Sequence, residues 1–268
     1  MNLIFSIVPK IAWNLSFGSL FHFIRLLFLL EYFLISREFL VITKDFLLPV
    51  VQGKRKYFLV LNKKNDLSAL KELFIDKVYS VPVVDPKIII DLGANFGESA
   101  LYFHLKYPLA QIYAVEPAHD SYRRLEVLAS TIPEIIPVQT AIAPHDGVID
   151  MYIFKELAMS NSIQMREGYS EVVSVKSSTY STFLRDYDLT RVDILKFDIE
   201  GGEDSLFEDP GVETSLCVVG EYHAHLAKTS ISDFVKYFKG MGFYVTPPDT
   251  SSDKFLLTAR RQDVKIVP

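Results

Sequence analysis

From Lys87 onward, short runs of consecutive apolar residues alternate with segments whose apolar residues recur at helical spacing. Runs that are apolar at every position are typical of strands buried on both faces of a parallel sheet. The pattern predicts strands at 88–92, 111–115, 135–142, 192–197, 216–219, 243–246 and 255–258, and helices at 98–106, 119–129 and 232–239. Residues 151–154 and 172–175 are predicted as an inserted pair of strands, and a further helix follows Gly202. This alternation indicates an α/β fold with a Rossmann-like, doubly wound, mostly parallel sheet.

Two segments precede this α/β domain, which we place at residues 87–268. Residues 51–86 form a lead-in, with a strand at 57–61 and then a helix for which Asp66 is placed as the N-cap. Residues 1–50 are predicted as an apolar helical extension. The chain is therefore expected to be one doubly wound domain behind a helical N-terminal part.

The membrane question depends on residues 17–36, an apolar helical pattern interrupted by Arg25 and Glu31. The insertion gain of its Leu, Ile and Phe residues and the cost of the two charges are each about 5 kcal/mol, so they nearly cancel. We expect a helix packed on the domain or on a partner. A helix lying at a membrane surface is the alternative, and a spanning helix ranks last.

The composition limits which binding partners and which cellular compartment are expected. Lys and Arg number 28 against 33 Asp and Glu, a net charge of -5, which disfavours a protein that grips nucleic acid through its phosphates. Cys217 is the single cysteine and sits in an apolar run, so we expect a core residue rather than a catalytic thiol or a metal ligand. The cytoplasm is the predicted location, with peripheral membrane contact through residues 1–50 as the alternative.

The first strand of the domain runs into a glycine turn at residues 91–97, DLGANFG. Ligands bind at the carboxyl ends of strands in such sheets, and glycine lets a backbone turn tightly against them. Asn95 stands where a dinucleotide fingerprint has its second glycine, and Glu98 follows Gly97 where a P-loop has lysine. The candidate binding residues are Asp91, Gly93, Ala94, Asn95 and Gly97. A strand–turn–helix junction that binds nothing is the alternative.

The second strand ends at Glu116, about 20 residues after the glycine turn. A carboxylate at this place can accept hydrogen bonds from both hydroxyls of a ribose. Together with Gly93 and Gly97 it predicts a nucleoside site.

Three segments carry a resemblance to a known family: residues 91–97, residues 113–117, and residues 193–203, DILKFDIEGGE. With them, the chain resembles the FkbM-type family of S-adenosylmethionine-dependent methyltransferases over roughly residues 65–260. Gly202 stands where alanine is more usual, and residues 1–50 have no counterpart. The resemblance implies that residues 87–268 bind S-adenosylmethionine and methylate a hydroxyl of a small molecule or glycan. A non-catalytic nucleoside-binding protein that serves as an interaction module is the rival interpretation.

Strand geometry suggests which residues do the chemistry. Asp198 and Glu200 point the same way if their strand stays regular, and Glu221 and His223 do so at the end of the next strand. We expect His223 to be the general base, with Asp198 or Glu221 orienting it or the acceptor. Asp198 is also predicted to contact the cofactor. A divalent cation bound by these four residues is an alternative that we do not favour, because carboxylates paired with Lys196 need no metal.

The polar loop between the inserted strands holds Asn161 and Ser162. It is long enough to approach the site, so we predict that Asn161, Ser162 and Glu200 contact the acceptor. An ordinary solvated turn is the alternative for the loop.

Overall fold

The computed structural model describes residues 45–52, 54–62, 65–154, 161–165, 167–246 and 254–261. Its centre is a seven-stranded sheet in the order β11-β12-β10-β9-β3-β4-β5. The strands are β3 (Ile88–Leu92), β4 (Gln111–Val115), β5 (Ile135–Val138), β9 (Val192–Phe197), β10 (Ser215–His223), β11 (Phe243–Thr246) and β12 (Lys254–Arg261). Only β12 among them runs antiparallel to its neighbours. The predicted doubly wound, mostly parallel sheet is confirmed.

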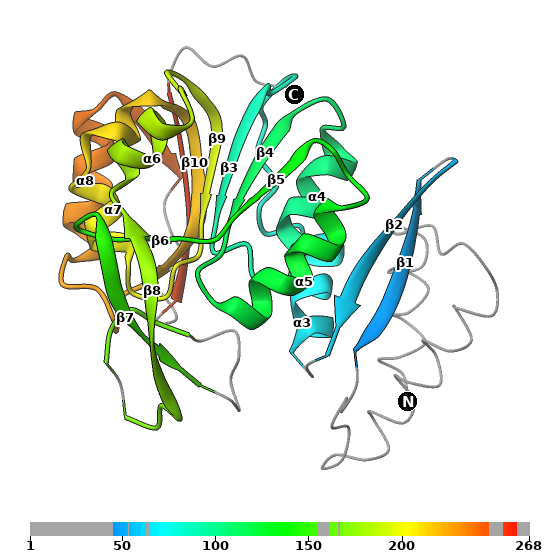
Figure 1. Ribbon diagram of the computed structural model, residues 1–268. Coiled ribbons are helices and arrows are strands. Elements are labelled where there is room, and N and C mark those ends of the chain that lie inside the picture. The colour runs from blue at the N-terminus through cyan, green and yellow to red at the C-terminus, as the bar shows by residue number, and fades with distance from the viewer. Residues whose placement is uncertain are drawn as a thin grey trace, which may run out of the picture.

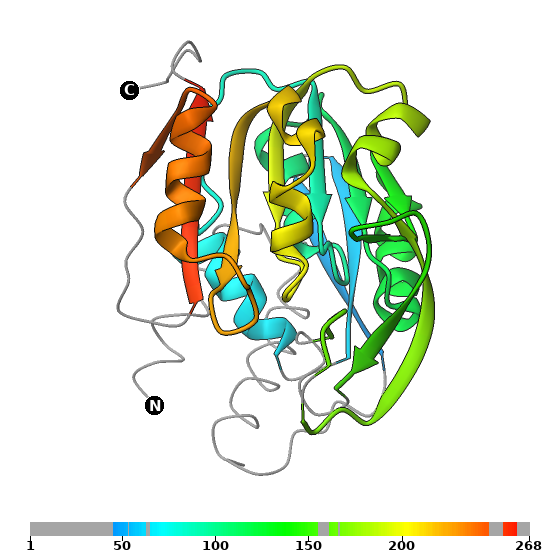
Figure 2. The ribbon, with the colours of Figure 1, turned by 90° about the vertical axis from the view of Figure 1, so that its left-hand side faces the viewer.

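Helices cover both faces of this sheet (Figures 1 and 2). One face carries α3 (Asp66–Lys71), the π-helical turn η1 (Glu72–Asp76), α4 (Glu98–Lys106) and α5 (His119–Ala129). The other carries α6 (Tyr180–Asp186), α7 (Glu203–Phe207), the 3-10 turn η3 (Pro210–Thr214) and α8 (Ile231–Gly240). Helix α6 was not predicted from the sequence.

Alternation along the strands explains why both faces are apolar. In β3, Ile89 packs into one core cluster with α3, α4 and α5, whereas Ile90 and Leu92 pack into the other with α6, α7 and α8. Cys217 is fully buried in the first cluster, and burial raises the pKa of its thiol to about 12. The thiol therefore acts as a core side chain, as predicted.

Two smaller sheets flank the centre. The hairpin of β1 (Phe46–Gln52) and β2 (Arg55–Leu61) packs through β2 on α5. The inserted sheet has the order β6-β8-β7, from β6 (Ala141–Ile142), β7 (Gly147–Ile153) and β8 (Glu171–Ser178). The prediction of a single strand at 135–142 was therefore wrong. Residues 135–138 form β5 in the central sheet, whereas residues 141–142 form β6 in the inserted sheet.

Two predictions for the N-terminal part need correction. Residues 46–50 belong to β1, so the predicted helical extension does not reach residue 50. Asp66 is not the N-cap of α3, because the helix begins after Asn65 and the Asp66 carboxylate accepts from Arg124 Nη1 at 2.7 Å. The predicted apolar helix at 17–36 lies outside the described residues. No helix in the described part of the chain is long and apolar enough to cross a membrane.

Candidate active site

A cavity opens at the carboxyl ends of β3, β4 and β9, the edge at which doubly wound sheets bind ligands. Four of the predicted cofactor residues line it: Gly93, Asn95, Glu116 and Asp198. Asp91, Ala94 and Gly97, which were also predicted, are buried and do not line it. These three build the turn from within the fold.

The glycine turn is held in a shape that few residue types adopt. Gly93, Asn95 and Gly97 all have positive φ angles, of 74°, 46° and 95°. A Cβ atom on Gly93 would lie 1.9 Å from the backbone oxygen of Asp198, so β3 and the segment after β9 approach each other as closely as glycine permits. This close approach forms one wall of the cavity.

Glu116 ties the turn to the start of α5. Its Oε2 accepts from the Asn95 amide at 2.9 Å and its Oε1 from the Ala118 amide at 2.8 Å. Burial raises the pKa of Glu116 to about 7, against the lowering effect of these two amide donors. Each carboxylate oxygen can accept a second hydrogen bond, so the group still has capacity for the two hydroxyls of a ribose.

The predicted pairing of Lys196 with the carboxylates at the mouth of the site is wrong. Its Nζ lies 2.9 Å from Asp91 Oδ1 and donates to the carbonyl oxygens of Leu92 and Gly93 at 3.2 and 2.9 Å. Burial lowers the pKa of Lys196, but the charges of Asp91, Asp198 and Glu98 and the hydrogen bond to Asp91 together raise it overall. The lysine therefore fixes the carboxyl end of β3 rather than neutralising Asp198.

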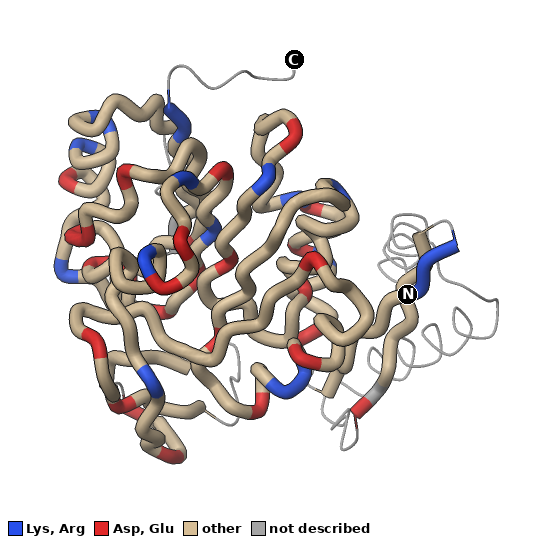
Figure 3. The backbone as a smooth tube through the Cα atoms, turned by 45° about the horizontal axis from the view of Figure 1, so that its top comes forward, with Lys and Arg blue, Asp and Glu red and all other residues tan. Residues whose placement is uncertain are grey.

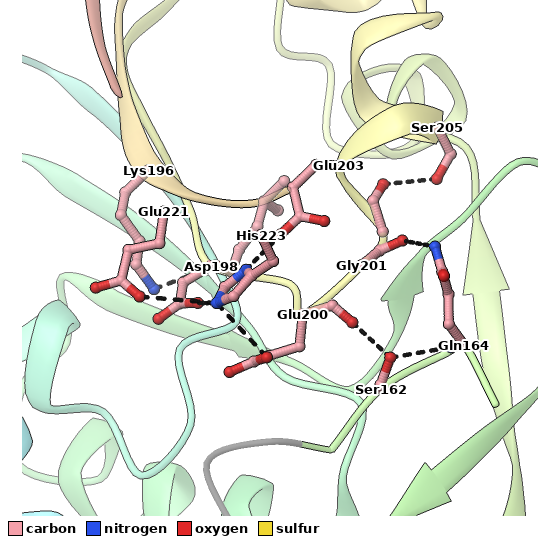
Figure 4. A network of polar contacts seen from close by, with 12 residues as sticks. Ser162, Gln164, Lys196, Asp198, Glu200, Gly201, Glu203, Ser205, Glu221 and His223 are labelled. Atoms are coloured by element: carbon pink, nitrogen blue, oxygen red, sulfur yellow. Dashed lines mark hydrogen bonds and ion pairs between the residues drawn. The ribbon is translucent and has the colours of Figure 1, made fainter. Parts of the chain in front are cut away.

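The chain leaves β9 irregularly. The strand ends at Phe197, and Glu200 and Gly201 have φ angles of 46° and 96°, so the predicted regular alternation through Glu200 is wrong. Ser162 Oγ donates to the Glu200 carbonyl at 2.5 Å, and Gln164 Nε2 donates to the Gly201 carbonyl at 2.6 Å (Figure 4). The loop after β7 thus holds the turn that presents Asp198 and Glu200.

The predicted residues of that loop lie in different surroundings. Asn161 lines the cavity, and its Oδ1 accepts from the Phe154 amide at 3.1 Å. Ser162 is buried, and its hydroxyl also accepts from the Gln164 amide at 3.0 Å. Asn161 remains a predicted acceptor contact, whereas the hydrogen bonds of Ser162 give it a structural role.

His223 stands at the centre of a carboxylate cluster (Figure 4). Strand β10 extends beyond the end of β9, which brings His223 beside the turn after β9. Its Nε2 lies 3.5 Å from Glu200 Oε2, 3.9 Å from Asp198 Oδ1 and 4.0 Å from Glu221 Oε2. The four residues predicted to act together are therefore gathered in one place.

The group that orients the histidine was not predicted from the sequence. His223 Nδ1 lies 2.8 Å from Glu203 Oε1, and Glu203 is fully buried at the start of α7. Asp198 and Glu221 approach only Nε2, so orientation of the ring falls to Glu203, and the other two are left to face the acceptor. The signal in the sequence was a second glutamate after the turn-forming pair Gly201 and Gly202.

The electrostatics of the cluster favour a charged imidazole. Burial lowers the pKa of His223, but the hydrogen bond to Glu203 and the charges of Asp198, Glu200 and Glu203 raise it to about 9. A proton on Nε2 then balances part of the carboxylate charge.

The same geometry bears on the metal question. Ligand atoms of Asp198, Glu200 and His223 all lie within 4.8 Å of one another, a spacing that suits a divalent cation. Since Lys196 pairs with Asp91, the reason given for disfavouring a metal does not hold. Activity of the cluster without a bound metal stays a prediction. Loss of activity on addition of a chelator would contradict it.

Comparisons with known proteins identify the family of the chain. The profile of the Methyltransferase FkbM domain matches residues 91–245, more than half of the chain. The chain belongs to the FkbM methyltransferase family. As a member of this family, the protein is a methyltransferase that uses S-adenosylmethionine as its methyl donor. The resemblance to the family, stated from the sequence, is confirmed.

Individual relatives are distant. Methyltransferase sdnD of Sordaria araneosa is 24% identical over 260 residues, covering 80% of this chain and 97% of its own length. Methyltransferase 1 of Beauveria bassiana is 27% identical over 157 residues, which is 50% of this chain and 62% of that protein. The crystal structure of methyltransferase FkbM from Methylobacillus flagellatus KT aligns with a TM-score of 0.46 at 13% identity. That alignment covers 65% of this chain and 44% of the other.

The residues present fit S-adenosylmethionine. Gly93 leaves a cradle that a Cβ atom would fill, Glu116 offers carboxylate oxygens for the ribose, and Asn95 lines the same cavity. When bound, the cofactor supplies an electrophilic methyl group.

Loss of the Glu116 carboxylate should weaken the cofactor complex. We expect Glu116→Ala to raise the Kd for S-adenosylmethionine about 10- to 100-fold, because charge-assisted hydrogen bonds to the ribose contribute roughly 1.5–3 kcal/mol. Calorimetry of folded protein measures this, with Glu126→Gln on the exposed side of α5 as the control. A Kd within twofold of wild type would remove Glu116 from the cofactor site.

Proposed function

We propose that this FkbM methyltransferase transfers the methyl group to a hydroxyl of a small molecule or glycan. The observation that supports this most directly is the imidazole of His223, whose Nε2 faces the end of the cofactor cavity while Glu203 holds Nδ1. Methyl transfer to a hydroxyl needs a base within hydrogen-bond reach of its proton. The chain offers such a group at this place.

The roles of the surrounding residues follow from their positions. His223 Nε2 takes the hydroxyl proton as the oxygen attacks the methyl carbon, and Glu203 stabilises the imidazolium that forms. Asp198 lines the cofactor cavity, and its Oδ2 accepts a hydrogen bond from the Tyr79 hydroxyl at 3.3 Å. Together with Glu221 it orients the acceptor. Alignment of the acceptor oxygen with the methyl group supplies the rest of the rate enhancement.

The distribution of charge supports a small acceptor. In Figure 3, Lys and Arg positions are interspersed with Asp and Glu positions along the described chain, and the mouth of the site is acidic. A phosphate backbone would meet repulsion there.

An experiment with ¹³C-methyl S-adenosylmethionine tests the proposal. The labelled product is isolated, and the chemical shift of the transferred methyl group distinguishes an O-methyl from an N-methyl or C-methyl group. We expect an O-methyl product. A methyl group on nitrogen or carbon would overturn the assignment to a hydroxyl, and binding of cofactor without transfer would favour the non-catalytic rival.

A further inference from the structure

A second cavity adjoins the cofactor cavity at Glu98, Asp198 and Glu200, which line both. Part of its remaining wall comes from α3, η1 and Tyr79, which precede the matched region 91–245. Because His223 Nε2 also faces Asp198 and Glu200, this cavity meets the cofactor at the end where the proposed base lies. The proposed function places the acceptor in this second cavity, which is called the acceptor cavity below, and the inference rests on that function.

The lining of the acceptor cavity is rich in Asp and Glu side chains. Five carboxyl side chains contribute to it: Glu72, Glu98, Asp198, Glu200 and Glu221. Lys196 is the one Lys or Arg side chain among the described residues that line it, and its Nζ is committed to Asp91 and two carbonyl oxygens. The cavity therefore presents an excess of negative charge to whatever enters it.

Glu98 adds an independent observation. Only 6% of this residue is exposed, and its Oε2 has no hydrogen-bond partner among the residues that the structure describes. Burial raises the pKa of Glu98 to about 8. A buried carboxylate without a donor is costly, so a cationic donor from a ligand at the junction of the two cavities would stabilise the ionised form of Glu98.

We propose that the acceptor carries a protonated amine, which binds among these carboxylates beside the hydroxyl that is methylated. An ammonium group is a compact cation with three donors, and it would match carboxylates that come from η1, α4 and β10. A single metal ion fits less well, since Glu72 and Glu98 do not belong to the group whose ligand atoms lie within 4.8 Å. Leu73 and Val78 provide an apolar wall for the carbon skeleton.

The test uses the full chain with deuterated-methyl S-adenosylmethionine and a small-molecule extract of the cells that make the protein. Products are passed over a cation exchanger at a pH where amines are protonated and are identified by mass spectrometry. We expect the deuterated methyl group in the retained fraction. Label in the unretained fraction, or none in the retained fraction while the protein still binds cofactor, overturns the inference.

Two variants locate the amine. Glu72→Gln should slow labelling about tenfold at limiting extract with the Kd for S-adenosylmethionine unchanged, because a hydrogen bond between charged groups is lost. Glu171→Gln is the matched control, since Glu171 lines a different cavity on the Glu116 side of the cofactor site. The inference is wrong if Glu171→Gln alone slows labelling, or if both variants behave like wild type.

Separate outcomes distinguish this inference from the proposed function. If chelation abolishes labelling and Mg²⁺ restores it, the cation in the cavity is a metal and the amine is not needed. If the retained product carries its methyl group on nitrogen, the amine is confirmed and the hydroxyl fails. If the labelled product is a neutral O-methyl compound, the hydroxyl stands and the amine fails.

Discussion

Replacement of His223 by alanine should lower kcat about 10²- to 10⁴-fold, the usual contribution of a positioned general base. The affinity for S-adenosylmethionine should stay near wild type, because His223 does not line the cofactor cavity. Steady-state kinetics and calorimetry on the same preparation measure both. His145→Ala is the control, since His145 is exposed in the bend before β7. Equal losses of kcat and of cofactor affinity would make His223 a structural residue.

The pH profile of kcat should report the same group. With the pKa of His223 raised to about 9, mainly by its hydrogen bond to Glu203 against the opposing effect of burial, about 1% of the imidazole is neutral at pH 7. Because only the neutral form accepts a proton, kcat should rise about tenfold per pH unit and level off near pH 9.

Glu203→Gln should move this inflection to lower pH, since it removes a negative charge that favours the imidazolium. It should also lower the plateau value, because the ring loses its charged orienting partner. A merely structural role for Glu203 would leave the inflection where it is.

Gly93→Ala should have the second large effect, on both stability and cofactor binding. A Cβ atom would lie 1.9 Å from the backbone oxygen of Asp198, and the φ angle of 74° is strained for alanine. Overpacking and backbone strain each cost about 1–3 kcal/mol, which together lower the Tm by roughly 4–20 °C. Because the turn must move to relieve the contact, binding of S-adenosylmethionine should be lost.

Thermal denaturation with and without S-adenosylhomocysteine checks the Gly93 prediction. Gly240→Ala is the matched control, because a Cβ atom there meets nothing within 4 Å and the glycine ends α8 with an ordinary backbone angle. That variant should have a Tm at or slightly above wild type. If Gly93→Ala retains wild-type Tm and cofactor affinity, the close approach of β3 to Asp198 does not define the pocket.

The sequence by itself determined the central strands and the cofactor edge. The bounds 88–92, 111–115 and 192–197 are those of β3, β4 and β9, because strands buried on both faces are apolar at every position and end where polarity begins. The glycine turn and Glu116 could be placed at one edge because parallel strands in such a sheet bring their carboxyl ends together. These features are local, or follow from strand order alone.

Tertiary structure alone decided which polar groups meet. Glu203 reaches His223 because the chain turns at Glu200 and Gly201, and Lys196 takes Asp91 as its partner because two central strands lie side by side. Glu72 joins the other carboxyl side chains of the acceptor cavity because it lies on η1, whose position depends on how the lead-in packs on α4. Hydrogen bonds and ion pairs between residues far apart in the chain leave no periodic signal in sequence, since their geometry is set by packing.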